Sequence, residues 1–443
     1  MMEDWLGRIV DLHTNSGITI TGYFVKPKDN IWFTGEMDIV DYRTISQDEN
    51  DAAFSLNGIK GDSVIQIDSA VFGNVTVDEN IAYVNILPFE ILIGAKFDPA
   101  KILSYSFSLP ELDNFFFQNI VSINTCISDL SHSISLKPMV SSMLTESGSD
   151  SSVEIYLNRF YQFQDSRNTF TIRSDNRIIV EPNTEFEINE IIQFVACITH
   201  FFSFILMEHV NLPSEVHVFF ESDSVDYPES TQLLINDNRR YYTQYKKEPA
   251  KILFSDIKEY VVPIWANWVQ FWNRKKNQPL IKLYSDVISY KSVGSNRYLN
   301  ICHALEHYSR IYREKEAEKV RKEKGEEYLS LCIRFIDLIR AFNDFFDLKE
   351  KEIELISGKL AKKRNYLSHY NYGKSKPATE INHFEEMRIE YDLENFAFRL
   401  FMVVVYNELQ VPKEIIEIAL SRSENTFTST LEQMFNGPRE EEE

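Results

Sequence analysis

Cysteine is scarce in this chain, which has four in 443 residues. Cys126, Cys197, Cys302 and Cys332 lie far apart and form no C-x-x-C pair, so the sequence predicts neither a zinc site nor a disulfide framework. The N-terminus carries acidic residues where a secretory signal would carry positive charge, and no clean apolar segment follows it. We therefore expect a protein of the reducing cytoplasm.

Positive charge is also in short supply. Lysine and arginine number 46 against 67 acidic residues, which gives a formal net charge of -21. Proteins that coat DNA need a basic surface that displaces counterions from the phosphates. The composition excludes that class, and any contact with nucleic acid must be local.

Only one long apolar run stands out, "IIQFVACITHFFSFILM" at 191–207. It is shorter than the roughly 20 residues that cross a bilayer, and Gln193, Thr199, His200 and Ser203 interrupt it. The pattern favours a buried core helix over a membrane span, so no membrane contact is expected. On such a helix His200 is more simply a hydrogen-bonded core histidine than a metal ligand.

Several catalytic motifs are missing from the sequence. It has no glycine-rich phosphate loop, no G-x-S-x-G elbow and no H-E-x-x-H, which leaves nucleotide hydrolysis, acyl transfer and zinc proteolysis without support. His303 and His307 lie four residues apart, a spacing that could hold a metal ion, but no third ligand is placed to complete the site. We expect neither a metal nor a cofactor.

Apolar residues make up 44% of the chain and aromatic residues 13%, enough to fill two or three domains. Short runs of alternating apolar and polar residues at 17–110 predict strands in a sandwich-like arrangement. We expect a β-rich domain at 1–145, and a second β region with the buried helix at 146–250 that packs on the first. The polar stretch at 141–152 reads as a loop or linker.

Helical periodicity dominates after residue 250. A tryptophan-rich helical connector is predicted at 251–280, an antiparallel helical bundle at 281–435 and a disordered tail at 436–443. The individual helix-period segments are 295–322, 324–347, 350–370, 383–409 and 412–421. The predicted fold class is therefore α+β, with the β-rich region first.

A cluster of polar residues occurs in "KKRNYLSHYN" at 362–371. On a helix Asn365 and His369, four apart, share one face, and Arg364 lies on the adjoining flank. A guanidinium suits phosphate oxygens, and a histidine can transfer a proton near neutral pH. The pair suits metal-free attack of an RNA 2'-hydroxyl on its own phosphate. Residues 279–375 hold 19 basic residues against 14 acidic ones, as a local phosphate site requires.

Neighbouring side chains could help to bind RNA. Lys362 and Lys363 precede the cluster, and Tyr366 and Tyr370 could stack on bases, although packing in the core or an interface would also explain these tyrosines. By spacing alone an arginine and a histidine five positions apart is a weak signal.

The sequence around this cluster resembles that of a known superfamily. "RNYLSHYN" on the third long helix, with "ICHALEHYSRIYRE" on the first, is similar to the HEPN (higher eukaryotes and prokaryotes nucleotide-binding) domains of the ApeA-like group. "TGYFVKPKDNIWFTGEMDIV" followed by "LIGAKFD" is similar to the β-rich domain that precedes HEPN in ApeA-type anti-phage proteins. The resemblance covers nearly the whole chain.

The resemblance implies a metal-independent RNA endonuclease, often acting on transfer RNA, that dimerises through the HEPN bundle and causes abortive infection. Arg364 would hold the phosphate, Asn365 would orient it, and His369 would act as general base or acid. Glu306 would orient His369 or pair with Arg364. Related toxins carry a tyrosine two residues after the histidine, where this chain has Asn371, so control by adenylylation there is not implied.

The N-terminal region would then sense a phage protein or restrain the nuclease. Two rival readings remain open. The bundle could bind a nucleotide or RNA without cutting it, or it could merely dimerise a carbohydrate-binding or protein-binding β domain.

Overall fold

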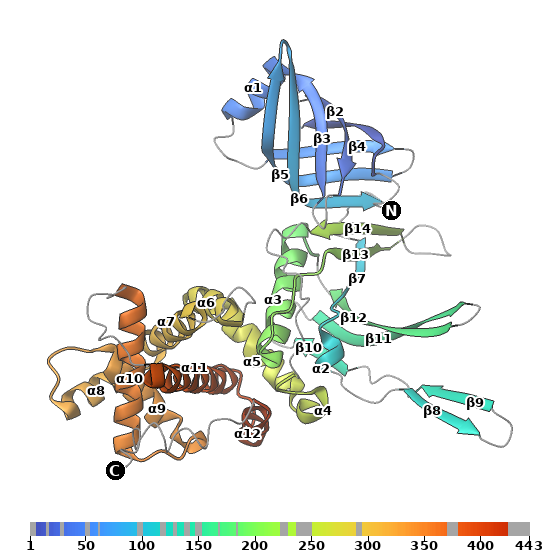
Figure 1. Ribbon diagram of the computed structural model, residues 1–443. Helices are drawn as coiled ribbons and strands as arrows, with labels where there is room; N and C mark the ends of the chain where they lie inside the picture. Colours follow the sequence, from blue (N-terminus) through green and yellow to red (C-terminus); the bar gives the residue numbers. More distant parts are fainter. Residues whose placement is uncertain are drawn as a thin grey trace. The chain divides into compact units, whose positions relative to one another are not determined.

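The chain forms two compact units (Figure 1). The computed structural model describes residues 6–423 except 15–16, 27–30, 49–53, 61–62, 95–100, 116–120, 127–130, 137–141, 147–152, 167–168, 183–184, 222–228, 236–249, 289–294 and 370–379. The β unit comprises residues 1–113, 118–196 and 211–242, and the helical unit comprises 114–117, 197–210 and 243–443. The α+β prediction is confirmed. The finer domain boundaries stay predictions.

The first six strands close into an antiparallel barrel. Their spatial order is β6-β3-β2-β1-β4-β5, and β5 pairs with β6 to complete the circle. These strands are β1 (Ile9–Thr14), β2 (Thr19–Val25), β3 (Trp32–Asp38), β4 (Phe54–Lys60), β5 (Ser63–Asp78) and β6 (Ile81–Gly94). Sandwich-like layers were expected here, whereas these six strands form a closed ring. A closed ring leaves no free strand edge for aggregation.

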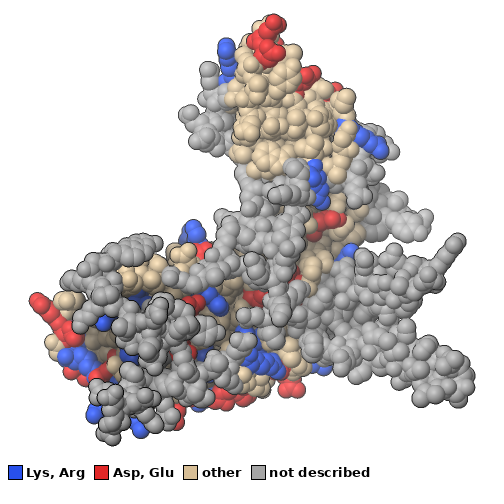
Figure 2. All heavy atoms as spheres, in the orientation of Figure 1, with Lys and Arg blue, Asp and Glu red and all other residues tan. Residues whose placement is uncertain are grey.

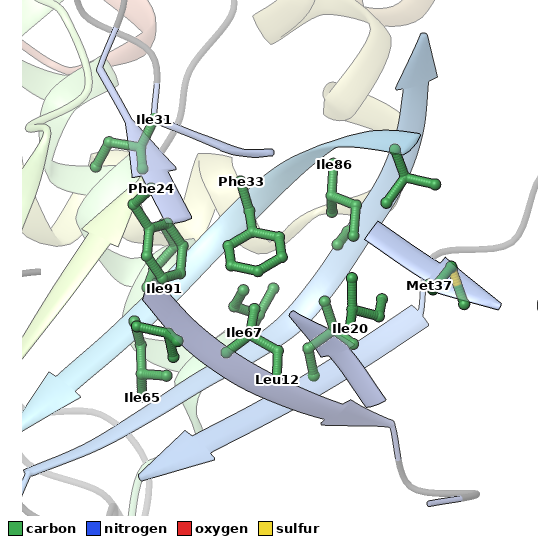
Figure 3. Packing of buried hydrophobic residues seen from close by; sticks show 14 of the residues in the cluster. Leu12, Ile20, Phe24, Ile31, Phe33, Met37, Ile65, Ile67, Ile86 and Ile91 are labelled. Atoms are coloured by element: carbon green, nitrogen blue, oxygen red, sulfur yellow. The ribbon is translucent and has the colours of Figure 1, made fainter. Parts of the chain in front are cut away.

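Alternate residues of the strands fill the barrel (Figure 3). In β2, for example, Ile20, Gly22 and Phe24 are buried while their neighbours are not. Gly22 pairs directly with Gly35 of β3, and the Phe33 ring lies against both glycines. Phe24 and Phe33 meet edge to face, with ring centroids 5.1 Å apart. The paired glycines thus make room for an aromatic ring at the centre of the core.

Strand β6 continues beyond the barrel into an open antiparallel sheet of order β6-β14-β13-β7-β12-β11-β10. Its members are β7 (Ile102–Ser108), β10 (Ser142–Glu146), β11 (Val153–Ser166), β12 (Thr169–Pro182), β13 (Glu215–Phe220) and β14 (Glu229–Ile235). A separate hairpin pairs β8 (Val121–Cys126) with β9 (Ser131–Leu136). The predicted loop at 141–152 is wrong for β10, because an edge strand forms by backbone pairing with β11 and needs no apolar periodicity.

Two short helices accompany the strands. Helix α1 (Ile39–Asp48) follows β3 directly, within the region 17–110 for which only strands were predicted. The Asp38 carboxylate accepts a hydrogen bond from the Val40 backbone N–H at 2.7 Å, which caps the helix and ends the strand. Helix α2 (Leu112–Phe115) follows β7.

Helix α3 (Ile188–Leu206) contains the long apolar run. Within the described residues it is the one helix long and apolar enough to cross a membrane, but 61% of that window is buried inside the protein. In the helical unit, Trp268 donates a hydrogen bond to the Cys197 carbonyl at 3.0 Å, and the Tyr406 hydroxyl donates to the Ile205 carbonyl at 3.0 Å. These contacts identify α3 as the predicted core helix.

The helical unit is built from helices that match the predicted segments with two changes. Its main helices are α4 (Phe254–Ile257), α5 (Val261–Asn273), α6 (Gln278–Ile288), α7 (Ser295–Tyr312), α8 (Glu314–Lys324), α9 (Leu331–Ala341), α10 (Glu350–His369), α11 (Glu380–Glu408) and α12 (Lys413–Arg422), with 3-10 turns η3 (Lys275–Asn277) and η4 (Asn343–Phe345). The predicted helix 295–322 breaks between α7 and α8, and 324–347 forms a helix only from Leu331.

Two ion pairs, each with one buried partner, hold the corner between α7 and α8. Arg313, at the corner, donates to both carboxylate oxygens of Asp337 at 2.8 and 2.9 Å, and Arg334 pairs with Glu314 at 2.6 Å. Arg334 and Asp337 are each only 3% exposed. Removing the partner of either buried side chain would leave an uncompensated buried charge. These ion pairs therefore stabilise the turn between α7 and α8.

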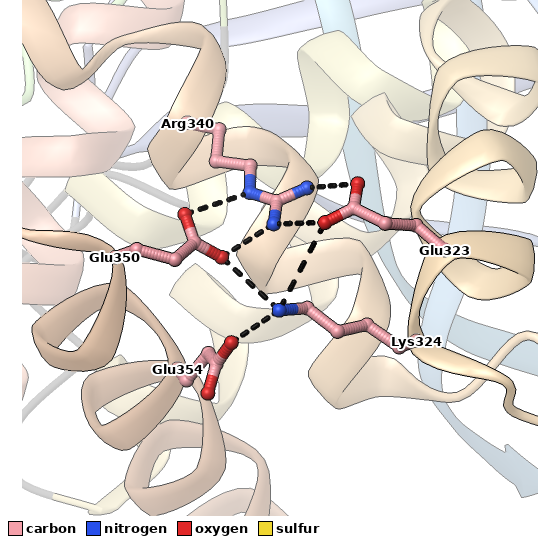
Figure 4. A network of polar contacts seen from close by, with 5 residues as sticks. All are labelled: Glu323, Lys324, Arg340, Glu350 and Glu354. Carbon is pink, nitrogen blue, oxygen red and sulfur yellow. Dashed lines mark hydrogen bonds and ion pairs between the residues drawn. The ribbon is translucent and has the colours of Figure 1, made fainter.

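A further ion network fixes the start of α10 (Figure 4). Arg340 of α9 donates to Glu323 of α8 at 2.9 Å and to Glu350 of α10 at 3.1 Å. Lys324 adds pairs to Glu350, at 3.2 Å, and to Glu354. Three helices therefore meet at one group of alternating charges. This network orients α10, the helix that carries Arg364.

We expect Gly22→Ala to destabilise the barrel by about 1–3 kcal/mol, as overpacking does in other cores. The added Cβ would overlap the Thr34 carbonyl oxygen and lie 2.5 Å from the Gly35 Cα. Hydrogen exchange of barrel peptides measures the loss of protection. Thr76→Ala, on an exposed position of β5, is the control and should shift stability by no more than about 0.5 kcal/mol. Equal protection in both variants would contradict the packing described here.

Candidate active site

Helices α7 and α10 pack against each other and bring the candidate residues together. Leu360 and Ala361 are the last buried apolar residues of α10, and Arg364 follows three positions later at the edge of the buried face. The Tyr298 hydroxyl of α7 donates a hydrogen bond to the Leu360 carbonyl at 2.8 Å. This buried bond joins α7 to α10 at Leu360, one helical turn before Arg364. Side chains of α7 can therefore reach the Arg364 guanidinium.

Glu306 lies between two guanidinium groups. Arg364 donates to one of its carboxylate oxygens at 3.2 Å, and Arg310 donates to the other at 2.7 Å. The side chains of Arg364 and Glu306 are 22% and 17% exposed, whereas that of Arg310 is 56% exposed. The three groups carry one net positive charge. The structure thus shows one of the two partners considered for Glu306, which is Arg364.

Asn365 and Lys362 lie toward solvent, whereas Lys363 packs over a buried ring. The Asn365 side-chain oxygen accepts a hydrogen bond from Arg364 at 3.3 Å, and its own side chain is exposed. Lys362 is exposed, while Lys363 places its ammonium 4.6 Å from the centre of the Tyr298 ring. Tyr366 is 45% exposed, which disfavours core packing for that tyrosine. The surface around Arg364 is therefore open to a ligand.

His369 is the last residue of α10, and its side chain lies outside the described residues, as does Tyr370. The helix backbone places it five residues, about 7.5 Å along the axis, beyond Arg364. The roles predicted for His369, Lys362 and Tyr370 stay predictions.

His303 joins the cluster from α7, one turn before Glu306. Burial lowers the pKa of its imidazole, the positive charge of Arg364 lowers that pKa further, and Glu306 opposes both effects. The ring is therefore mostly neutral at pH 7. Sequence reasoning considered His303 only as a metal ligand beside His307, but no group of three metal-ligating side chains occurs among the described residues. The i, i+3 spacing between His303 and Glu306 could have indicated that both belong to the site. Arg310, which pairs with Glu306, was also not predicted as a site residue.

Cys302, beside His303 in sequence, cannot serve as a nucleophile. The side chain is completely buried, and burial raises the pKa of its thiol to about 12. The thiolate is the reactive form of cysteine. The chemistry of the cluster therefore rests on its guanidinium, carboxylate, amide and imidazole groups.

More than half of this chain matches a known protein family. The family model described as ApeA N-terminal domain 1 matches residues 18–268. The chain belongs to this family. Comparisons with curated proteins and with solved structures found no match.

Membership of the ApeA family indicates a role in anti-phage defence, and it confirms the predicted ApeA resemblance for the N-terminal region. The match runs from the barrel into α5 and ends before α7 and α10. The expected HEPN identity of the bundle therefore stays a prediction, supported by the cluster around Arg364.

We expect Arg364→Met to raise the pKa of His303, because it removes a nearby positive charge and frees Glu306 to stabilise the imidazolium. Glu306→Gln should lower the same pKa. NMR titration of the imidazole, assigned with His303→Asn, measures both shifts. Lys351→Met removes a positive charge about 20 Å away along α10 and is the control. A His303 pKa that is the same in all three variants would show that Arg364 and Glu306 do not act on this ring.

Proposed function

We propose that this ApeA-family protein is a metal-independent RNA endonuclease of the HEPN type that acts in anti-phage defence by abortive infection. One observation carries the proposal: Arg364 is held beside exposed Asn365 by Glu306, on the helix that ends at His369. An acidic chain has little reason to keep this arrangement on its surface unless it binds an anion.

The reaction follows from these groups. A base takes the proton of a ribose 2'-hydroxyl, the 2'-oxygen attacks the adjacent phosphorus, and the bond from phosphorus to the 5'-oxygen breaks. An acid protonates the leaving 5'-oxygen, so the products are a 2',3'-cyclic phosphate and a 5'-hydroxyl. His369 acts as base or acid, and neutral His303 is suited to accept a proton. Arg364 stabilises the negative charge that develops on the phosphate oxygens.

Arg364 can bind a phosphate without losing Glu306. A guanidinium has five N–H donors, and the structure shows one directed at Glu306 and one at Asn365. Glu306 thus acts as a positioning residue, because it fixes the direction in which the remaining donors point. Asn365 orients the phosphate through its exposed amide.

A homodimer through the helical bundle would complete the machinery. Each protomer supplies one Arg364 and one His369, so a second copy provides both an acid and a base together with a paired cationic clamp. The substrate is RNA, for which the resemblance points to transfer RNA, and the site of action is the cytoplasm. No cofactor is required.

Purified protein should cleave transfer RNA in EDTA and leave 2',3'-cyclic phosphate ends. His369→Ala and Arg364→Ala should each reduce the rate by about 100-fold or more, because each removes an acid–base or charge-stabilising group. Lys351→Ala, an exposed lysine at the start of α10, is the control and should cleave like the parent. Equal binding by all variants with no cleavage by any of them would instead identify a non-catalytic RNA-binding module.

The β unit would sense a phage protein or restrain the nuclease until infection, since unrestrained RNA cleavage would harm the host. Phe33→Ala empties the barrel centre and should cost about 3–5 kcal/mol. We expect either growth arrest of uninfected cells or loss of protection against phage, depending on which role dominates. Adding Arg364→Ala should abolish the arrest. Phe33→Ala cells that grow and resist phage like the parent, as Thr76→Ala cells should, would refute a regulatory β unit.

A further inference from the structure

Three consecutive cations lie at the junction of α5 and α6. Arg274 separates α5 from η3, and Lys275 and Lys276 form the first two residues of η3; all three side chains are exposed. We propose that these residues, the junction cations, form a second RNA-binding site that grips the phosphate backbone away from Arg364. The inference rests on the proposed function, because it names how the substrate is held.

The junction cations are three adjacent, exposed positive charges, and they differ from most arginines of the helical unit. Among the described residues, none of them has a carboxylate within 4 Å, although the chain has a net charge of -21. Carboxylates pair with most of the arginines around them, namely Arg310, Arg313, Arg321, Arg334, Arg340, Arg364 and Arg422. Unpaired, adjacent positive charges repel each other, and an anionic ligand would remove that repulsion.

A buried scaffold holds the junction cations in place. Asn277, which is fully buried, donates to the Phe271 carbonyl at 2.9 Å and accepts a hydrogen bond from the Tyr312 hydroxyl at 2.6 Å. Lys276 places its ammonium 4.6 Å from the centre of the Tyr312 ring. The backbone turn and the Lys276 side chain are thus tied to the end of α7, which reduces the entropy lost when a ligand orders them.

The local electrostatic environment compensates these charges only in part when no ligand is bound. Lys275 and Lys276 stand at the start of the helical segment that continues into α6, where the helix dipole is positive. The carboxyl of Glu408 interacts with both Arg274 and Lys276, but it already accepts a hydrogen bond from Tyr308 at 2.7 Å. Neither feature stabilises a cation as well as a bound phosphate would.

The junction site and the Arg364 cluster use different faces of α7. Tyr308 and Tyr312, four residues apart, face the junction, whereas Glu306 and Arg310, also four apart, face Arg364. At about 100° per residue, Glu306 and Tyr308 point about 200° apart around the helix. A mononucleotide cannot occupy both places, but a longer strand that crosses the surface of the helical unit can.

The ligand that fits is the backbone of a single RNA strand. Three adjacent cations match successive phosphates, and the half-buried ring of Tyr312 borders the site beside Lys276. Contacts of this kind bind without regard to sequence and weaken as salt rises. The junction site would therefore contribute affinity, and the Arg364 cluster would contribute the chemistry.

The test measures binding of a fluorescent RNA strand of about 16 nucleotides to full-length protein carrying His369→Ala, so that cleavage does not interfere. Adding Lys275→Glu and Lys276→Glu together should raise the Kd at least tenfold and reduce the slope of log K against log salt by about 1.4, or about 0.7 for each lost phosphate contact. Lys351→Glu carries the same type of charge change on α10 and should alter the Kd less than twofold. Lys275→Arg should bind like the parent.

Several outcomes would overturn the proposal. One is an unchanged Kd and salt slope in the double variant. Another is displacement of the RNA by millimolar inorganic phosphate or ATP, which would show a site for small phosphates. A third is a Kd that rises equally with Lys351→Glu. Circular dichroism melting identifies any unfolded variant, and Lys275→Gln then replaces the double change.

The outcome is separate from that for the nuclease. If the parent cleaves RNA and the double variant binds normally, only the junction site is refuted. If the double variant loses binding and the parent cleaves nothing, the nuclease is refuted and the binding site remains.

Discussion

The contact between Glu306 and two arginines governs the candidate site. A carboxylate that lies between Arg310 and Arg364 is worth more than an exposed ion pair, because its side chain is only 17% exposed and solvent screens it less. The hydrogen bond from Tyr298 to the Leu360 carbonyl supports the same helix pair from the buried side. The position of Arg364 therefore depends on how α7 packs against α10, and not on α10 alone.

Charge in the helical unit is arranged locally. Figure 2 shows basic and acidic side chains interspersed over its visible face, whereas the visible barrel surface is mostly uncharged. Most of its described arginines belong to ion pairs such as those of Arg340 with Glu323 and Glu350. Against this background the Arg364 cluster and the junction cations stand out, since they present positive charge to solvent. Under the proposed function, such local positive charge would let an acidic protein bind RNA at these places and repel it elsewhere.

Much of the helical unit could be predicted from sequence, because helical periodicity is a local property. The predicted segments at 350–370 and 412–421 agree closely with α10 and α12. The corner at Arg313 could not be predicted, because its ion pairs join residues far apart in sequence. Arg313 pairs with Asp337, 24 residues later, and its neighbour Glu314 pairs with Arg334, 20 residues later. His303 and Arg310 were missed for a similar reason: local pattern does not reveal which face of α7 meets α10.

The β unit was harder to predict. Alternation identified its strands, but the pairing of β6 with β14 joins residues more than 130 positions apart, and β1 and β4 close the barrel through only two residue pairs. Helix α1 could have been found from Asp38, whose carboxylate caps it directly after a strand. Short strands with few apolar residues, such as β10, carry little signal because edge pairing depends on the backbone.

Strand β6 belongs to two structures at once. One edge of it pairs with β5 along nearly its whole length, and the other edge pairs first with β3 inside the barrel and then with β14 of the open sheet. The barrel cannot open at β6 without also removing the strand against which β14 is aligned. Barrel and open sheet should therefore melt together as one cooperative block, so that damage to either would be felt by both.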